Sequence, residues 1–401
     1  MEAILERPAI HSAESLTQKI HHIGQELAEE TQAEENNRRI SAKTLSLLRK
    51  NHLHKLYLPM SLGGLELEPP SVAYLIETVS TYNTAAGWSM MVANTSEWWS
   101  WRLPEKGIEK IFQNREDILI AGAFHPPMAA VREKGGFRVN GRSPLCSNVH
   151  DSDFVFVTAL EMQDGQPIMH DGIPEIVGVM MLTGDVRIFD NWDTIGMQAT
   201  DSCDVAAENV FVPDDLSFPL APVWKPNHYF EGALYRFPAI GASIATLIAP
   251  VALAVARNAI DEVKIIATKK TSFGSVSNLA GRGAVQSKIG KAEALLSASR
   301  HYLYDELKSA WDKTLAGHSF TLEEKAGLLL AGTHCIQSCF QAVDLMYSVA
   351  GTTGIYKRSK LSHLFADAQV IRQHGFANES RYETAAQVLL GMQPDLPVLA
   401  F

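Results

Sequence analysis

The feature that most constrains the fold is a change in hydrophobic periodicity that occurs twice along the chain. Residues from about 15 to 113 place apolar side chains at helical spacing, for example Ile20, Ile23 and Leu27. Residues from about 118 to 213 instead form short β-rich runs, separated by turn sequences such as Lys134-Gly135-Gly136. Beyond a proline-containing loop, helical spacing returns and continues almost to the end of the chain. This order predicts an α+β protein with helices, then a small β-domain, then helices.

The points at which the periodicity changes also predict the domain limits. We expect an N-terminal helical domain over residues 1–117, a middle β-domain over 118–222 and a C-terminal helical domain over 223–401. Several short strands within one such domain are typical of a small barrel or sandwich, of which we expect the barrel, and sustained helical spacing at the end is typical of a four-helix bundle. The predicted helices of that bundle are residues 238–267, 282–313, 322–351 and 363–390.

Charge and cysteine content exclude several classes of protein. The chain carries 45 acidic and 35 basic side chains, a net charge of −10, whereas nucleic-acid binding needs a concentrated basic face. Four cysteines are too few for a disulfide scaffold. Cys335 and Cys339 have no second Cys/His pair nearby, so core packing is favoured over a metal site. We therefore expect no nucleic acid, no bound metal and a reducing, cytoplasmic setting.

Two segments bear on the question of membranes. Met1 to Ser12 lacks the apolar core of a secretory signal, so no cleaved leader is expected. Residues 237–256 carry no charge and are long enough to cross a bilayer. They are, however, rich in alanine and include Pro238 and Pro250. This composition favours a buried central helix, packed closely through small side chains, over a membrane span.

Three stretches carry the most specific patterns. The first is Leu145-Cys146-Ser147-Asn148-Val149-His150-Asp151-Ser152-Asp153. The second is Trp192-Asp193-Thr194-Ile195-Gly196-Met197-Gln198-Ala199-Thr200-Asp201-Ser202-Cys203-Asp204-Val205, followed by Val210-Phe211-Val212-Pro213. The third comprises Ser348 to Tyr356, Asp367-Ala368-Gln369 and Gln373-His374-Gly375. Together with the order of elements, these stretches resemble the acyl-CoA dehydrogenase fold over nearly the whole chain.

Within that family, the chain most resembles the oxygenase components of two-component flavin-dependent monooxygenases, relatives of 4-hydroxyphenylacetate and dibenzothiophene monooxygenases. The resemblance lies in residues 121–126, in residues 234–238 and in the Gln373-His374 pair. A dehydrogenase needs a carboxylate base near Gly375 or near Tyr235, and neither residue is acidic. The resemblance thus implies a flavin enzyme that lacks the base of a dehydrogenase.

The resemblance implies that reduced flavin, FMNH2 or FADH2, reacts with O2 through a C4a-(hydro)peroxyflavin to oxygenate a small aromatic or heterocyclic molecule. The chain has no Gly-x-Gly-x-x-Gly after a strand, so reduced flavin is expected from a separate NAD(P)H:flavin reductase. The family also implies a homotetramer with flavin at the subunit interfaces. Three alternatives remain open: an acyl-CoA dehydrogenase or oxidase, an amine N-oxygenase on the same scaffold, and a flavin-free helical assembly protein.

The resemblance also selects candidate site residues. His374, with an ordinary pKa near neutrality, and Ser147, whose hydroxyl can bond to a flavin near N5, are the expected catalytic residues. The expected cofactor-binding residues are Phe124, His125, Cys146, Ser147, Thr200, Ser202, Lys270, Phe273, Gly351 and Thr352. The expected substrate pocket is lined by Trp88, Asn94, Trp98 and His150. Structural alternatives exist, because strand-end serines bond their own backbone and tryptophans on helices commonly form core.

Three positions depart from the family's usual pattern. Asn148 replaces a glycine, and His150 stands one place earlier than the usual histidine. Lys270 stands where dehydrogenases often have an arginine, so it would meet a phosphate as a point charge, without a bidentate fork.

Overall fold

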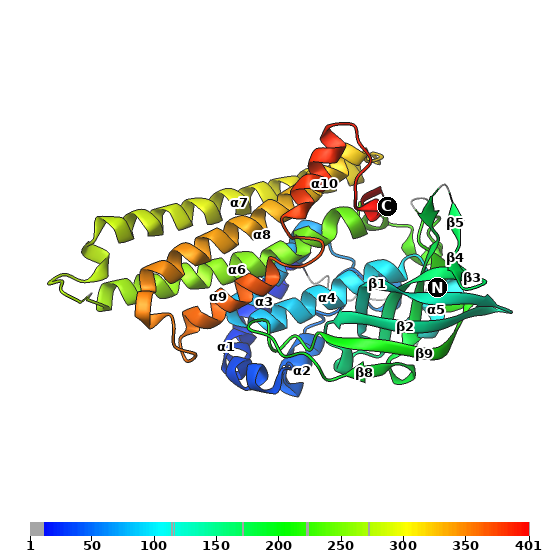
Figure 1. The fold of residues 1–401 in the computed structure, drawn as a ribbon, viewed down its shortest axis with the longest axis horizontal. Helices are drawn as coiled ribbons and strands as arrows, with labels where there is room; N and C mark the ends of the chain where they lie inside the picture. Colours follow the sequence, from blue (N-terminus) through cyan, green and yellow to red (C-terminus); the bar gives the residue numbers. More distant parts are fainter. Residues whose placement is uncertain are drawn as a thin grey trace, which may run out of the picture.

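The computed structural model describes residues 12–113, 115, 117–170, 172–221, 224–271 and 273–400, so the expectation about a leader at Met1 to Ser12 lies almost wholly outside them. The described chain runs through helices, then strands, then helices (Figure 1), which confirms the predicted α+β class. Helices give way to strands between Phe112 and Ile120. The numbered domain limits remain predictions.

The helices of the N-terminal part begin at local signals in the sequence. They are α1 (Ala13–Asn37), α2 (Ala42–Lys50), α3 (Pro69–Tyr82), α4 (Thr84–Ser100) and α5 (Glu105–Phe112). Ser12 and Ser41 cap the first two helices by accepting hydrogen bonds from backbone N–H groups of the first turn. Asn83 caps α4 by accepting from the Ala86 N–H at 3.0 Å. Almost every residue of α4 is buried, because this helix packs against α3, α6 and β1.

The main strands of the middle part form one sheet in the order β10-β7-β3-β1-β2-β9-β8, with β4 paired to β3. The strands are β1 (Ile120–Glu133), β2 (Gly136–Cys146), β3 (Phe154–Gln163), β4 (Gln166–Pro167), β7 (Ile176–Leu182), β8 (Arg187–Phe189), β9 (Cys203–Pro213) and β10 (Ser217–Pro219), while β5 (Met169–His170) and β6 (Ile173–Pro174) pair separately. β1 and β3 are parallel, and the other pairs are antiparallel. The domain predicted as a small barrel is therefore, in the described residues, a sheet whose edges are β10 and β8.

The C-terminal part is a bundle of helices, of which α6, α7 and α8 are the longest (Figure 1). The helices are α6 (Ile240–Lys269), α7 (Gly283–Leu315), α8 (Leu322–Ala350), α9 (Lys360–Ile371) and α10 (Ser380–Leu389). The most apolar window of α6 is 94% buried, so the segment that could span a bilayer by composition is a core helix, as expected. A Cβ on Gly332 of α8 would lie 2.6 Å from the backbone carbon of Ala245, so glycine lets α8 approach α6 closely.

The predicted helix over residues 363–390 is wrong, because the chain breaks between α9 and α10. His374, expected within a helix, lies in this break. There the Phe376 N–H donates to His374 Nδ1 at 3.3 Å, and the Ser380 N–H donates to Asn378 Oδ1 at 3.0 Å. These side-chain acceptors replace backbone carbonyls, and such competition ends helices.

Candidate active site

A cavity of about 460 Å³ lies where the sheet meets the helices. Its wall comes from α4, β1, β2, the loop before β9, the first turns of α6 and the α9–α10 break. Apolar side chains such as Trp88, Phe124 and Ile244 form most of it. The described lining contains no Lys, Arg, Asp or Glu, and its titratable side chains are His125 and His374. The cavity therefore suits apolar, uncharged groups.

Three hydroxyl groups form a row in the cavity wall. Ser147 Oγ accepts a hydrogen bond from Trp88 Nε1 at 3.1 Å and lies 2.7 Å from Ser202 Oγ. Ser202 Oγ lies 2.8 Å from Thr200 Oγ1, which donates to the Met197 carbonyl oxygen at 2.9 Å. All three side chains are buried. The row thus connects the cavity with the loop that precedes β9.

The far end of this row is fixed against α9. Asp367 Oδ1 accepts a hydrogen bond from the Met197 N–H at 2.6 Å, and Trp192 Nε1 donates to the Met197 carbonyl oxygen at 3.0 Å. Gly196 permits the close approach, because a Cβ there would lie 2.3 Å from the backbone carbon of Ala366. Burial raises the pKa of the Asp367 carboxyl to about 7, and the Met197 N–H opposes that rise.

His374 lines the cavity from the α9–α10 break. Because the Phe376 N–H donates to Nδ1, the neutral ring carries its proton on Nε2. Burial lowers the pKa of His374 to about 4, so the ring is neutral near pH 7. Trp88 meets the ring nearly edge to face, with 5.8 Å between centroids. No described residue accepts a hydrogen bond from Nε2, so this N–H is available to a molecule in the cavity.

These residues fit the isoalloxazine ring that the family resemblance implies. The walls are carbon-rich and the volume suits a ring system. Ser147 Oγ, which already accepts from Trp88, keeps acceptor capacity on the cavity side. When bound there, a flavin would be held by Ser147 and flanked by Trp88 and Phe124.

The cavity brings together much of the predicted site and leaves other members outside. The predicted residues that line it are Trp88, Phe124, His125, Ser147, Thr200, Ser202 and His374. Cys146 is fully buried beside the cavity, and burial raises the pKa of its thiol. Asn94 is a structural residue that accepts from the Leu56 N–H at 2.7 Å and donates to the Leu53 carbonyl oxygen at 2.9 Å. Trp98 lines a different cavity, of about 440 Å³.

The remaining predicted cofactor residues lie at the other end of the bundle. Lys270 follows the end of α6, and its Nζ donates to the Ala350 carbonyl oxygen at 2.6 Å and to Thr353 Oγ1 at 2.8 Å. Ile248 of α6 lines the cavity, and a helix rises about 1.5 Å per residue, so Lys270 lies roughly 30 Å away along α6. Phe273 is fully exposed there, and Gly351 and Thr352 are exposed too. A ring held at Ser147 cannot touch this distal set of Lys270, Phe273, Gly351 and Thr352 in the same subunit.

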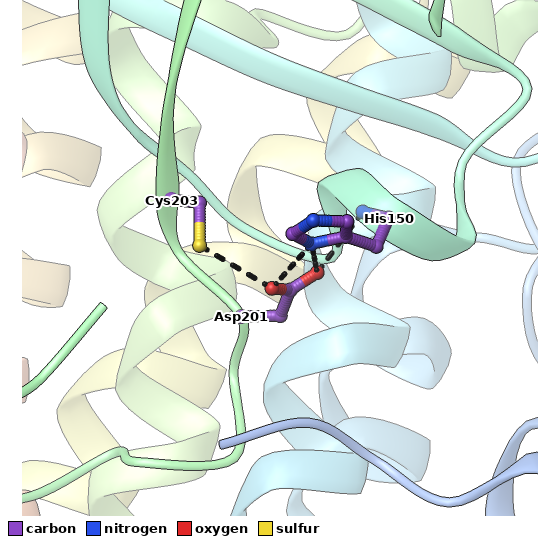
Figure 2. A group of neighbouring side chains, drawn as sticks. All are labelled: His150, Asp201 and Cys203. Atoms are coloured by element: carbon purple, nitrogen blue, oxygen red, sulfur yellow. Dashed lines mark hydrogen bonds and ion pairs between the residues drawn. The ribbon is translucent and has the colours of Figure 1, made fainter. Parts of the chain in front are cut away.

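The predicted pocket residue His150 belongs to a separate cluster with Asp201 and Cys203 (Figure 2). One oxygen of the Asp201 carboxylate lies 2.8 Å from His150 Nδ1, and the other accepts a hydrogen bond from the His150 backbone N–H at 3.0 Å. The carboxylate also accepts from Arg39 Nε at 3.3 Å and from the Cys203 thiol at 3.5 Å. Arg39 Nη2 lies 2.9 Å from His150 Nε2. Because donors and a guanidinium charge already surround this carboxylate, the cluster fits a structural anchor better than a cation site.

Sequence reasoning missed the residues that support the cavity wall. Trp192 and Met197 stand within the quoted 192–205 stretch, and Asp367 stands within the third pattern. The patterns marked these positions but gave no role to their side chains. Phe376 was missed entirely, and its backbone N–H fixes the tautomer of His374.

Comparisons with known proteins agree with this architecture. A family model described as the acyl-CoA dehydrogenase C-terminal domain matches residues 246–379. An indole-3-acetate monooxygenase from Pseudomonas putida is 30% identical over 361 residues, which are 90% of each chain. The p-hydroxyphenylacetate 3-hydroxylase oxygenase component from Acinetobacter baumannii is 23% identical over 403 residues, 96% of this chain and 91% of that one.

Among solved structures, XiaF from a Streptomyces species, in complex with FADH2 and glycerol, superposes with a TM-score of 0.87 at 20% identity and covers 96% of this chain and 97% of its own. This likeness shows the fold. The identity to the Pseudomonas relative shows the family. The chain belongs to the flavin-dependent monooxygenases with the acyl-CoA dehydrogenase fold.

Proposed function

We propose that the chain is the oxygenase component of a two-component system, which receives reduced flavin from a separate NAD(P)H:flavin reductase and oxygenates a small, uncharged aromatic or heterocyclic molecule. The observation that carries the proposal is an apolar cavity with a buried hydroxyl, Ser147, and a neutral imidazole, His374. A relative that is an oxygenase component supports the separate reductase. The free thiols of all four cysteines support a cytoplasmic setting.

In the proposed reaction one atom of O2 enters the substrate and the other leaves as water. The flavin supplies two electrons and two hydrogens when it is bound. Ser147 holds the ring at the cavity wall, and Trp88, Phe124 and Phe376 exclude water from it. His374 holds a proton on Nε2, from which it donates a hydrogen bond to an acceptor atom or to the π-face of the aromatic substrate and so orients it.

The cavity disfavours the dehydrogenase alternative. Removal of the α-proton of a thioester requires a base, and no described lining residue is a carboxylate. Gly375 lines the cavity without a side chain, and Tyr235 lines the different cavity that contains Trp98. The absence of a lining carboxylate also disfavours N-oxygenation of a protonated amine, which would enter without a counter-charge.

The experiment that tests the proposal is reconstitution with purified components. The chain is combined with NADH, FAD or FMN, an unrelated flavin reductase and indole as a neutral aromatic probe, under isotopically labelled oxygen gas. We expect one labelled oxygen atom in the product, and neither product nor NADH consumption when the reductase is omitted. Robust NADH turnover by the chain alone, or a product whose new oxygen atom is unlabelled, would contradict the proposal.

The charge of the substrate is a second, separable part of the proposal. Indole-3-acetate carries a carboxylate, but the described lining of this cavity offers no cation to pair with it. Burial of an unpaired carboxylate costs several kcal/mol, so kcat/KM should be at least about a hundredfold lower for indole-3-acetate than for indole. Indole-3-acetamide has almost the same shape without the charge, and it should lie close to indole. A carboxylate substrate that is used as well as its amide would overturn this part.

The distal set supports the proposal of a homotetramer. These residues lie far from the cavity of their own subunit, yet the family resemblance assigns them to the flavin. Phe273 and the neighbouring Val276 are fully exposed apolar side chains, which is typical of a surface that a partner covers. In the proposed assembly, the distal set of one subunit completes the flavin site of another, and Lys270 approaches a phosphate there.

A further inference from the structure

The row of hydroxyl groups in the cavity wall has a fixed direction. Its first member is the Trp88 indole N–H, which can only donate, and its last is the Met197 carbonyl, which can only accept. Between them stand the hydroxyls of Ser147, Ser202 and Thr200, each with one proton. Every contact along the row can be a hydrogen bond in only one arrangement. In it, each group donates to the next one, in the order Trp88, Ser147, Ser202, Thr200 and the Met197 carbonyl.

This direction determines what Ser147 offers to the cavity. Its proton is directed away, toward Ser202 Oγ at 2.7 Å, and one lone pair receives the Trp88 N–H at 3.1 Å. A hydroxyl oxygen has two lone pairs, so one remains for a molecule in the cavity. Ser147 is therefore an acceptor toward the cavity as long as the row is intact.

Reduced and oxidised flavin differ at N5, the ring position that the family resemblance places near Ser147. Reduced isoalloxazine carries a hydrogen on N5, whereas the oxidised ring has a lone pair there. We propose that the directed row Trp88–Ser147–Ser202–Thr200–Met197 selects reduced flavin over oxidised flavin, with Asp367 as the positioning residue that fixes its far end. The inference rests on the proposed function, because it requires the ring to lie at Ser147.

Asp367 acts through the backbone of Met197. Its carboxyl oxygen accepts the Met197 N–H at 2.6 Å, and Met197 holds a left-handed φ of 52°, which is unfavourable for a residue with a side chain. The carbonyl of Met197 can receive Thr200 only while this turn persists. Trp192 Nε1, 3.0 Å from the same carbonyl oxygen, supports the turn from the other side.

The test is the ratio of the dissociation constants for oxidised and reduced flavin, with the reduced form titrated without oxygen. Thr200→Val keeps the shape of the side chain but removes the acceptor of the Ser202 proton. Ser202 can then donate to Ser147 instead, and the Ser147 proton can turn toward the cavity. We expect the ratio to fall about tenfold or more, because oxidised flavin gains a hydrogen bond from Ser147 and reduced flavin loses one. Thr200→Ser keeps the hydroxyl and should keep the ratio, whereas Ser202→Ala should lower it.

The midpoint potential of bound flavin gives a second reading that does not depend on turnover. Tighter binding of the reduced form raises this potential, and for two electrons a tenfold change in the ratio is about 30 mV. The potential should therefore fall by about this amount in Thr200→Val and in Ser202→Ala. An unchanged ratio and potential in both variants would overturn the inference.

Asp367 is tested by a matched pair of variants. Asp367→Asn keeps an oxygen that accepts from Met197 and should keep the binding ratio, whereas Asp367→Leu removes the acceptor and should lower it. Circular dichroism of both variants separates this effect from loss of the fold. If Asp367→Leu is folded and keeps the parent ratio, Asp367 is not a positioning residue. If the parent binds neither form of flavin, the proposed function itself fails, which is a different result from flavin binding with an unchanged ratio.

Discussion

At the scale of single residues, Ser147 and His374 have different tasks in one cavity wall, and substitutions should separate them. Ser147→Ala removes a hydrogen bond to the flavin, and the loss should speed the unproductive release of hydrogen peroxide by about ten- to a hundredfold. His374→Ala should lower the product yield with nearly unchanged flavin affinity, and His374→Gln, which retains an N–H, should recover part of the yield. Product and peroxide per NADH measure both effects, and parental values in both alanine variants would make these residues structural.

The low pKa of His374 predicts how stability depends on pH. Burial lowers this pKa from 6.5 to about 4, so as pH falls the unfolded chain takes up the proton first. The fold therefore loses stability as pH falls from 6.5 to 4, by about 3 kcal/mol at most. His374→Gln should lose correspondingly less, measured by urea unfolding at about pH 7 and about pH 4.5. His54, whose pKa burial also lowers to about 4, is present in both proteins and cancels. An identical pH dependence of the two proteins would contradict the prediction.

How far residues could be predicted depended on whether a pattern also specifies side-chain direction. Ser147 lines the cavity, whereas its neighbour Cys146, assigned to the same cofactor, is fully buried and does not line it. Cys146 is the last residue of β2, whereas Ser147 begins the turn after it, and the sequence pattern does not say which of the two side chains faces the cavity. Asn94 and Trp98 were misplaced for a related reason, since α4 is buried on nearly all sides and its composition alone does not say which side meets the cavity.

At the scale of elements, the contact between the loop before β9 and α9 should depend on Gly196. A Cβ at this position would lie 2.3 Å from the carbon and 2.4 Å from the oxygen of the Ala366 backbone carbonyl, so Gly196→Ala must push the loop off the helix. We expect a loss of about 1–3 kcal/mol in unfolding free energy, together with weaker flavin binding. Gly184→Ala is the matched control, because a Cβ there meets nothing within 4 Å, and it should be nearly neutral. Equal melting temperatures for the two variants would show that the contact is not needed.

The elements themselves were largely predictable, and the exception concerns the active site. The core helices α6, α7 and α8 follow from sustained helical spacing, because packing and periodicity agree there. The segment 363–390 has the same spacing but divides at residues 372–379, where the His374 and Asn378 side chains take over backbone hydrogen bonds. Hydrophobic periodicity shows which face of a helix is apolar, but it does not show where side chains compete for backbone hydrogen bonds.

At the scale of the whole molecule, the family resemblance assigns Lys270 to the flavin, yet Lys270 lies about 30 Å from the cavity along α6. We therefore expect two subunits to build each flavin site. The assembly should have four times the 44.1 kDa mass of one chain, measured by light scattering. The sharper test combines two defective variants. His374→Ala damages the cavity and leaves the distal set intact, whereas Lys270→Glu damages the distal set and leaves the cavity intact.

When these two variants are produced together, random assembly gives about a quarter of the sites an intact cavity from one subunit and an intact distal set from another. Product formation should therefore rise toward roughly that fraction of the parent value, above the lowered product yield of either variant alone. Separately purified variants that are mixed without exchange of subunits are the control, and they should show no such gain. If co-production restores nothing while mixed tetramers are present, one subunit builds the whole site, and Lys270 and Phe273 have no part in binding a neighbour's flavin.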